Sequence, residues 1–523
     1  MTGNMNSELV KDTTRNSDEA LAGERSIGRA PTQAFHVYAA LLAICCIAHF
    51  TVHIGPAKFH HPAWWFSALT IFLACVLLQK ITLPRFFALL GVQITHVLVD
   101  SPFNPDHWLL IFFVNLATLF AAGSIMIRVK RQNVGRTITE SELYELLAPA
   151  GRVIFLICYG FAAFSKLNTH FLGIDSSCAR ELAETQISMS PWVAYISIPS
   201  IAGWMAVLCE SAVALLLIAP RLRRYGILVG MLFHTIIVLS PAIAVFDFTI
   251  TVFTMLFLFT PPEMMPRLNE RWQSFKSSAP DVCKLFATMR TPLVCFVALF
   301  MIGRSAMGYA VYGNARISTL IWMVNMSIAV TLIGWGVSLL FSKDSTADPQ
   351  RDEVGSPVGQ SPERGSPFRG SLGLRPRVAM QWLIVAIAVF NGLCPYLGLK
   401  TQNSFTMFSN LKTENGHWNH LIVPRSMRVF SRFQDRNFEV ASISDKRLQV
   451  DFVEPDHLIP QFELYRALSK DPAMSVTLIE QGQPVTLSGT SLEPVLGAAP
   501  SWWMRKLMIF RPVTRAGEPY CGN

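Results

Sequence analysis

A lysine at the end of a long apolar run is the first residue whose type and position could support chemistry. In the stretch FAAFSKLNTHFLGIDSSCAREL, residues 161–182, Lys166 follows an apolar segment where a membrane boundary would fall. A lysine in this position can anchor a helix by extending its ammonium group to the lipid headgroups. Alternatively, burial disfavours the charged form and leaves a free amine that can act as a general base. The residues alone leave both interpretations open.

Ionisable residues interrupt three other apolar runs. Glu210 lies within GWMAVLCESAVALLL, Arg304 lies within VALFMIGRSAMGYAVY, and Asp247 lies within a third apolar stretch. A charge at the centre of a bilayer costs roughly 3 kcal/mol or more unless it is paired or hydrated. We therefore predict a structural ion pair between Glu210 and Arg304. The alternative is that some of these residues line a polar cavity.

Histidines form a third group of candidates, because histidine can bind metals or carry protons. His49 and His53 are spaced i, i+4, so a helix would place both on one face. Neither a carboxylate nor a third ligand follows at a fixed spacing, and we therefore predict no metal site. Further histidines occur in later apolar segments or at their ends, namely His96, His107 and His234.

The elements that must position these residues are long apolar segments. Of the 523 residues, 51% are hydrophobic and 15% are charged, whereas charged residues make up about 25% of an ordinary soluble protein. Together with a mean hydropathy of +0.37, these values exclude a soluble globular enzyme and a disordered scaffold. We predict an all-α polytopic membrane protein with about 11 transmembrane helices and a small, mainly-β C-terminal domain. The predicted spans are 35–54, 63–79, 84–99, 108–127, 153–172, 192–219, 225–240, 242–260, 292–313, 317–341 and 378–398.

The positions of Lys and Arg predict the orientation of these spans, because cytoplasmic loops are enriched in basic residues. With a cytoplasmic N-terminus, most basic residues between spans fall inside and the C-terminal domain lies outside. The basic residues behind the net charge of +9 are thus spread over several loops, and we predict the lipid bilayer and no nucleic acid as a partner. The predicted domains are a disordered cytoplasmic N-terminus at 1–34, a transmembrane domain at 35–341, a flexible cytoplasmic linker rich in Pro, Gly and Ser at 342–377, the last span at 378–398 and an extracytoplasmic domain at 399–523.

The region 399–523 should fold as this small outer domain. Strand-like runs occupy 425–434, 438–443 and 448–454, and residues 457–470 have helical periodicity. Three cysteines fall on or near the predicted outer side, where an oxidising compartment permits a disulfide between two of them. They are Cys178, Cys394 and Cys521, and the sequence does not select the pair.

Three segments together resemble a known family. AAFSKLN at 162–168, NPDHWLLIFFVNLATLF at 104–120 and MLFHTIIVLSPAIAVFDFTITVFTMLFLF at 231–259 are similar to motifs of the vitamin K-dependent γ-glutamyl carboxylase superfamily, also called the horizontally transferred transmembrane (HTTM) domain family. A fourth segment, SFTMFSNLK at 404–412, resembles the stretch that leads into the lumenal β domain of the carboxylase. Thr406 stands where the carboxylase has Asp.

The resemblance implies roles for individual residues. Lys166 matches the lysine proposed as the catalytic base, and His107 matches the histidine thought to support it. We expect both to converge with His234 on one cavity near the outer leaflet, roofed by the outer domain around Ser404–Asn410. The residues expected to bind the quinone are His234, Phe233, Asn168, Met407 and Asn410.

The implied activity is a lyase-type carboxylation that depends on a reduced quinone of the menaquinone or vitamin K type, with oxygen and carbon dioxide. The lysine deprotonates the quinol, whose reaction with oxygen yields an epoxide and a base strong enough to remove a γ-proton from glutamate in a secreted peptide. An apolar site at the membrane edge suits this chemistry because it excludes water. The alternative is a non-enzymatic membrane factor for the export, maturation or binding of secreted peptides.

Overall fold

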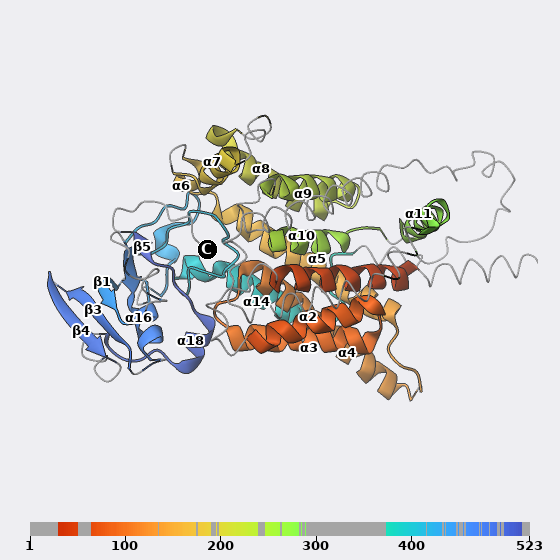
Figure 1. Cartoon of the computed structure of the whole chain (residues 1–523), viewed down its shortest axis with the longest axis horizontal. Coiled ribbons are helices and arrows are strands. Elements are labelled where there is room, and N and C mark those ends of the chain that lie inside the picture. The colour runs from red at the N-terminus through yellow and green to blue at the C-terminus, as the bar shows by residue number, and fades with distance from the viewer. Residues whose placement is uncertain are drawn as a thin grey trace, which may run out of the picture.

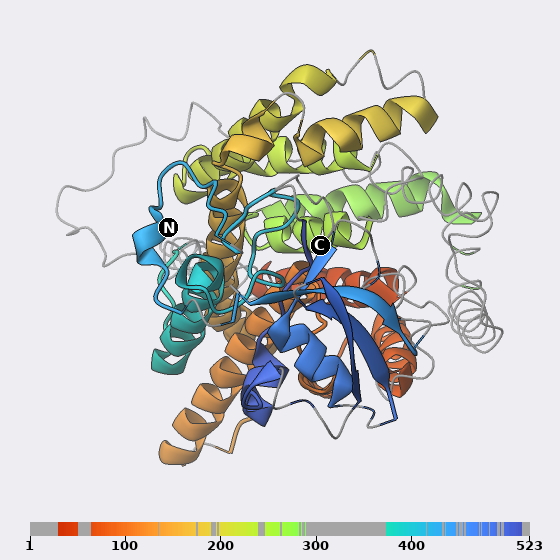
Figure 2. The same ribbon diagram turned by 90° about the vertical axis from the view of Figure 1, so that its left-hand side faces the viewer.

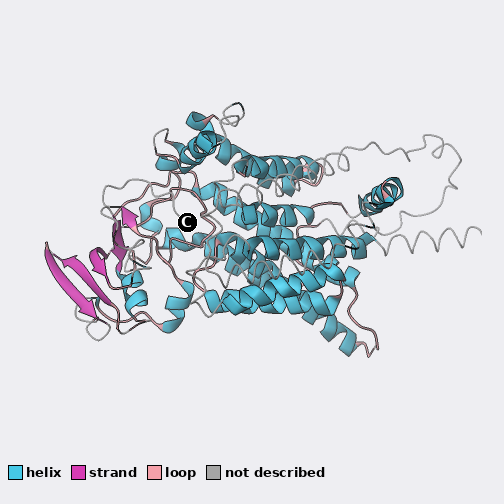
Figure 3. Ribbon diagram, viewed as in Figure 1, coloured by secondary structure: helices cyan, strands magenta, loops and turns pink. Residues whose placement is uncertain are grey.

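The computed structural model describes mainly residues 30–50, 64–281 and 373–514, with short gaps inside the last two ranges. Within these residues, long helices form a bundle, and a small β-rich domain lies at one end of it (Figure 1; Figure 3). Shorter helices outside the bundle are α6 (Thr169–Leu172), α7 (Cys178–Met189) and α11 (Met264–Ser278). The bundle contains Ala30–Phe50, α2 (Trp64–Gln79), α3 (Leu83–Asp100), α4 (Asp106–Arg131), α5 (Glu140–Ser165), α8 (Ala202–Ile218), α9 (Arg223–Ile237), α10 (Phe246–Phe257) and α14 (Ala379–Leu397).

Six helices of the described residues are long and apolar enough to cross a membrane, which agrees with the predicted membrane protein. Helices α2 and α10 are apolar but shorter. The predicted spans 292–313 and 317–341 lie outside the described residues, as do most of the N-terminus and the linker. The total of eleven therefore stays a prediction. The six helices are Ala30–Phe50, Leu83–Asp100, Asp106–Arg131, Glu140–Ser165, Pro199–Ile218 and Ala379–Leu397.

Local signals explain where α5 begins and ends. Thr139 caps the helix, because its side chain accepts a hydrogen bond from the backbone N–H of Glu142. The helix runs to Ser165, and Lys166 is its C-terminal cap. The predicted span 153–172 was therefore placed too late in the sequence, because apolar content alone does not report the polar cap. Asn168 then caps the short helix α6 by accepting from the backbone N–H of Phe171.

Close packing holds α5 in the middle of the bundle. The buried Arg152 of α5 donates from Nε to the carbonyl oxygen of Leu258, 2.6 Å away at the end of α10. On another face, α14 approaches through Gly392, where an added Cβ would lie 2.3 Å from the ring of Phe161. These contacts fix the position of the helix whose last residues precede Lys166.

The C-terminal domain contains a five-stranded antiparallel sheet in the order β4-β3-β1-β2-β5. Figure 2 looks onto the molecule from this end, where the strands and α16 (Gln461–Leu468) lie against the bundle. Apolar side chains of the sheet and α16 form a separate small core. The strands are β1 (Asn437–Ile443), β2 (His457–Pro460), β3 (Ser475–Glu480), β4 (Gln483–Ser488) and β5 (Val513–Thr514).

The predictions for this domain were right in part. The strand at 438–443 is confirmed as β1, whereas 448–454 lies largely outside the described residues. The strand at 425–434 was wrong: its described residues contain a 3-10 turn and no strand, because Phe430 donates to the carbonyl of Leu397 at the end of α14. The helix at 457–470 begins only after Pro460, and the residues before it pair with β1 and β5.

The cysteines predicted on the outer side differ in state. Cys178 is disulfide-bonded, whereas Cys394 is a free thiol. Cys521 lies outside the described residues. The backbone N–H of Cys178 donates to Asn410 Oδ1 at 2.8 Å, so the disulfide lies beside the segment that follows α14.

Candidate functional site

Lys166 is buried and ion-paired. Its side chain is 5% exposed, and Nζ lies 2.9 Å from Oε2 of Glu210, whose side chain is 10% exposed. Nζ also donates to the carbonyl oxygen of Ala162 at 3.2 Å. The pair joins the end of α5 to the middle of α8. The lysine therefore points into the protein and not toward a surface, in contrast to an anchoring lysine.

The predicted partner of Glu210, Arg304, lies outside the described residues. The Glu210–Arg304 pair therefore stays a prediction. The observed contact with Lys166 already gives the buried carboxylate a cation at hydrogen-bonding distance. A buried carboxylate requires such a partner, because the loss of hydration is otherwise uncompensated.

His234 forms a second buried group in α9. Its Nε2 lies 2.5 Å from the hydroxyl oxygen of Tyr159 in α5. The ring packs edge-on against Phe233 and Phe248, and His234 is 1% exposed. Among the described residues, Nδ1 of His234 has no hydrogen-bond partner. A buried nitrogen of this kind can bind a polar atom of a ligand.

His107 belongs to a third group. Its Nε2 lies 2.7 Å from Oδ2 of Asp247, and Nδ1 of His49 lies 2.9 Å from the same oxygen. The two ring nitrogens are 3.1 Å apart. Phe248 separates this group from His234, since its ring centroid lies 5.8 Å from that of His107 and 5.0 Å from that of His234.

The three residues expected to converge are thus distributed over neighbouring contacts. Lys166 contacts Glu210, His234 contacts Tyr159, and His107 contacts His49 and Asp247. Lys166 and His234 nonetheless lie close enough to interact electrostatically. Tyr159 is the residue that the sequence did not indicate, because a tyrosine within an apolar run carries no signal of its own.

Asn168 connects the lysine motif to the segment that follows α14. Its Nδ2 donates to the carbonyl oxygens of Ser165 at 2.8 Å and of Ser409 at 2.5 Å. Asn419 donates to Oδ1 of Asn168 at 3.2 Å and to the carbonyl oxygen of Asn410 at 2.8 Å. The segment that follows α14, which includes Ser409 and Asn410, therefore lies directly against the end of α5. This is the segment expected from the sequence to cover the region of Lys166.

The segment 403–410 has an unusual backbone. Four residues that are not glycine have positive φ angles between 46° and 61°, namely Asn403, Phe405, Phe408 and Asn410. Such a conformation costs about 1 kcal/mol or more per residue and persists only where the surroundings enforce it. Here the backbone N–H of Phe405 donates to Oδ1 of Asp106 at the start of α4, 2.7 Å away. Met407 is buried in the core of the bundle.

Charged and titratable groups of the outer segment are also buried. Burial lowers the pKa of Lys400, whose Nζ donates to the carbonyl oxygen of Asn403. In the neighbouring helix α6, partial burial, followed by the nearby cation Lys412, lowers the pKa of His170. For Glu414, burial is the largest single effect and raises the pKa, but Arg511 at 2.8 Å, the backbone N–H of Thr413 and Lys412 together outweigh it, so the net pKa is lowered.

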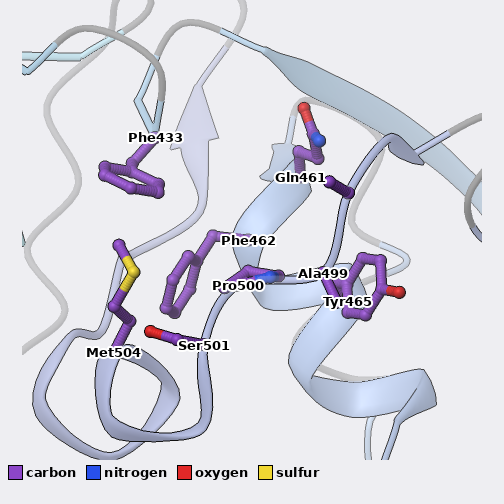
Figure 4. A pocket seen from close by; sticks show the side chains of 9 residues that line it. Phe433, Gln461, Phe462, Tyr465, Ala499, Pro500, Ser501 and Met504 are labelled. Atoms are coloured by element: carbon purple, nitrogen blue, oxygen red, sulfur yellow. The ribbon is translucent and has the colours of Figure 1, made fainter.

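A pocket of about 120 Å³ lies in the C-terminal domain, away from the lysine (Figure 4). Figure 4 shows the rings of Phe433 and Phe462 and the side chain of Met504 on one side of it, and Gln461 and Tyr465 on the other. Its lining is mostly apolar and consists of Phe433, Gln461, Phe462, Tyr465, Ala498, Ala499, Pro500, Ser501 and Met504.

Comparisons with known proteins do not place the chain in a family. No family model matches it, and neither a curated protein nor a solved structure matches it.

Proposed function

We propose that the chain is an integral membrane enzyme in which Lys166 acts as a general base on a reduced, lipid-soluble quinone. The proposed outcome is carboxylation, or a related modification, of a secreted peptide. The observation that supports this proposal most is the buried contact of Lys166 with Glu210 at the end of α5. The resemblance of residues 162–168 and 104–120 to the carboxylase superfamily supports it independently.

The ion pair provides a route for the lysine to become a base. The proposed resting pair is an ammonium ion on Lys166 and a carboxylate on Glu210, and the distance between Nζ and Oε2 is 2.9 Å. Transfer of one proton from Nζ to Oε2 yields a neutral amine and a neutral acid. The amine can then accept a proton from a quinol hydroxyl. Burial excludes bulk water, which would otherwise quench a strong base.

The residues around His234 fit a quinol. If the Tyr159 hydroxyl donates to Nε2, the neutral imidazole carries its proton on Nδ1, which can then donate to a quinol oxygen. Phe233 and Phe248, which both pack edge-on against this ring, add aromatic surroundings. When bound, the quinol would supply the reducing equivalents for oxygen activation. His107, one aromatic ring away, is assigned a positioning role.

Insertion in the bilayer is part of the proposal. Large apolar side chains are exposed along α8 and α14, and lipid would cover them favourably. We propose a multi-pass protein with its N-terminus in the cytoplasm and residues 399–523 outside, so that a secreted peptide meets the end of the bundle that carries Lys166. The exposed side chains are Trp204, Met205, Leu208, Leu215, Leu383, Ile387 and Phe390.

The test uses full-length protein in lipid nanodiscs with reduced menaquinone, and it measures quinone epoxide by mass spectrometry. Lys166→Ala should abolish epoxide formation, and Lys166→Arg should do the same because a guanidinium group stays protonated. The exposed Lys130 offers a matched control, and Lys130→Ala should keep wild-type activity. Full activity of Lys166→Arg would contradict the role of Lys166 as a base.

A second candidate function is a non-enzymatic factor for secreted peptides. The apolar pocket of the C-terminal domain favours it, because aromatic and methionine side chains suit an extended apolar peptide. Under this alternative, Phe462→Ala should impair release of secreted peptides into the medium, whereas Lys166→Ala should not. Under the enzymatic proposal, Lys166→Ala should abolish epoxide formation, whereas Phe462→Ala should leave it unchanged.

A further inference from the structure

Two histidines and one aspartate meet inside the bundle, although they lie far apart in the sequence. His49 comes from the helix Ala30–Phe50, His107 from the first turn of α4, and Asp247 from the first turn of α10. Their exposed fractions are 3%, 7% and 1%. Nδ1 of His49, Nε2 of His107 and Oδ2 of Asp247 form a triangle with edges of 3.1, 2.9 and 2.7 Å. The three atoms therefore lie close enough together to contact one ion.

Hydrogen bonds cannot close this triangle. A ring nitrogen is either a donor or an acceptor, and it cannot be both at once. If both histidines donate to Oδ2 of Asp247, their two N–H groups face each other across the third edge. If one histidine N–H instead donates to the ring nitrogen of the other histidine, it no longer donates to Oδ2 of Asp247. At most two of the three close contacts can be linear hydrogen bonds, whereas a cation satisfies all three lone pairs together.

The surroundings hold the three side chains in this orientation. The ring of His49 stacks on Trp108 with a centroid distance of 4.0 Å and an interplanar angle of 9°. The other carboxylate oxygen of Asp247, Oδ1, accepts from the backbone N–H of Phe248 at 2.9 Å, which directs Oδ2 to the histidines. A site whose ligands are oriented by their neighbours loses less entropy when it binds an ion.

The donor set selects the kind of ion. Two imidazole nitrogens and one carboxylate oxygen suit Zn²⁺ or Fe²⁺ and leave at least one coordination position open. Ca²⁺ and Mg²⁺ instead prefer oxygen ligands throughout. A tetrahedral ion with bonds of about 2.1 Å holds its ligand atoms about 3.4 Å apart. Binding therefore requires the edges of the triangle, now 3.1, 2.9 and 2.7 Å, to widen by about 0.3–0.7 Å.

We propose that His49, His107 and Asp247 bind one divalent transition-metal ion, Zn²⁺ or Fe²⁺, inside the helical bundle. The spacing of His49 and His53 alone predicted no metal, because the other two ligands come from α4 and α10. The site goes beyond the proposed reaction of Lys166 and does not depend on it.

The test is the metal content of full-length protein, purified in detergent without chelators and then reconstituted with Zn²⁺ or, without oxygen, with Fe²⁺. Wild-type protein should hold about one ion per chain after dialysis, and His49→Ala and Asp247→Asn should lose roughly 90% of it. His234→Ala removes an equally buried histidine outside the triangle and should keep the ion. Lys166→Ala should also keep it, which separates this result from any result on quinol chemistry.

A measurement on the wild type covers the case in which the variants do not fold. Protein loaded with Cu²⁺ should give pulsed electron paramagnetic resonance signals from two histidine nitrogens. Wild-type protein that holds no ion after reconstitution, or an ion without coupling to histidine, would overturn the proposal. Retention of the ion by folded Asp247→Asn together with folded His49→Ala would overturn it as well.

Discussion

Replacing Glu210 by glutamine leaves the Lys166 ammonium group without its buried carboxylate. Both side chains are at least nine-tenths buried, and their charged atoms are 2.9 Å apart. Removing one partner of a buried pair costs about 3–5 kcal/mol, because the remaining charge stays desolvated. We therefore expect Glu210→Gln and Lys166→Met to lower the free energy of unfolding by about this amount each.

The double variant is the sharper part of this prediction. Replacing both charges by apolar groups of similar size is often neutral or stabilises a protein by about 1–4 kcal/mol. Lys166→Met combined with Glu210→Leu should therefore recover most of the stability that either single change removes. The assay is reversible unfolding in mixed detergent micelles, with the interaction energy taken from a double-mutant cycle that also includes the single variant Glu210→Leu.

The surface pair Arg180–Glu184 is the matched control. Its atoms are 2.7 Å apart, but the side chains are 33% and 51% exposed. Water screens such a pair, so Glu184→Gln should cost less than about 0.5 kcal/mol. If Glu210→Gln cost as little as Glu184→Gln, the contact of Lys166 would not be a desolvated ion pair, and the proposed proton transfer would lose its basis.

Three further predictions concern the outer domain and the orientation of the chain. Arg511 helps to keep the pKa of folded Glu414 below its unfolded value of about 4.3. Ionised Glu414 therefore stabilises the fold above that pH, and this stabilisation is lost as the pH falls through the folded pKa. Glu414→Gln should remove this loss and so flatten the acid side of a curve of unfolding free energy against pH. Cys394 is free and Cys178 is bonded, so we predict a Cys178–Cys521 disulfide, which non-reducing peptide mapping would reveal and another partner would contradict. A cysteine at Ser356 should resist impermeant thiol reagents in intact cells, and strong labelling there would reverse the predicted orientation.

The apolar helices were predictable because each signal is local. The apolar run 108–127 must be buried in protein or lie in lipid, whichever segments pack beside it. It forms the main part of α4. The limits of the helices were less predictable, since α5 starts at a threonine cap well before its apolar part. The strand β2 was missed for a related reason: the periodicity of 457–470 continues through Pro460, where the backbone changes from strand to helix.

Side-chain partners were not predictable from one sequence. Lys166 and Glu210 were each indicated, but their contact depends on how α5 packs against α8. The sequence also indicated His49 and Asp247 as separate candidates, but it did not indicate their contact, because 198 residues separate them in the chain. Spacing identifies groups on one helix face, whereas groups on different helices meet only through tertiary packing.

The contacts between the bundle and the outer segment have a consequence for synthesis of the chain. Asp106 accepts a hydrogen bond from the backbone N–H of Phe405, 299 positions later in the chain. Asn168 donates to the carbonyl oxygen of Ser409, 241 positions later. A growing chain makes its N-terminal parts first, so α4 and α5 exist long before the segment that covers the end of α5. The surroundings of Lys166 are thus completed only after residue 409 of 523 has been made, and a chain that terminates earlier would hold the lysine without them. Unfinished chains should therefore lack any activity that depends on a shielded amine.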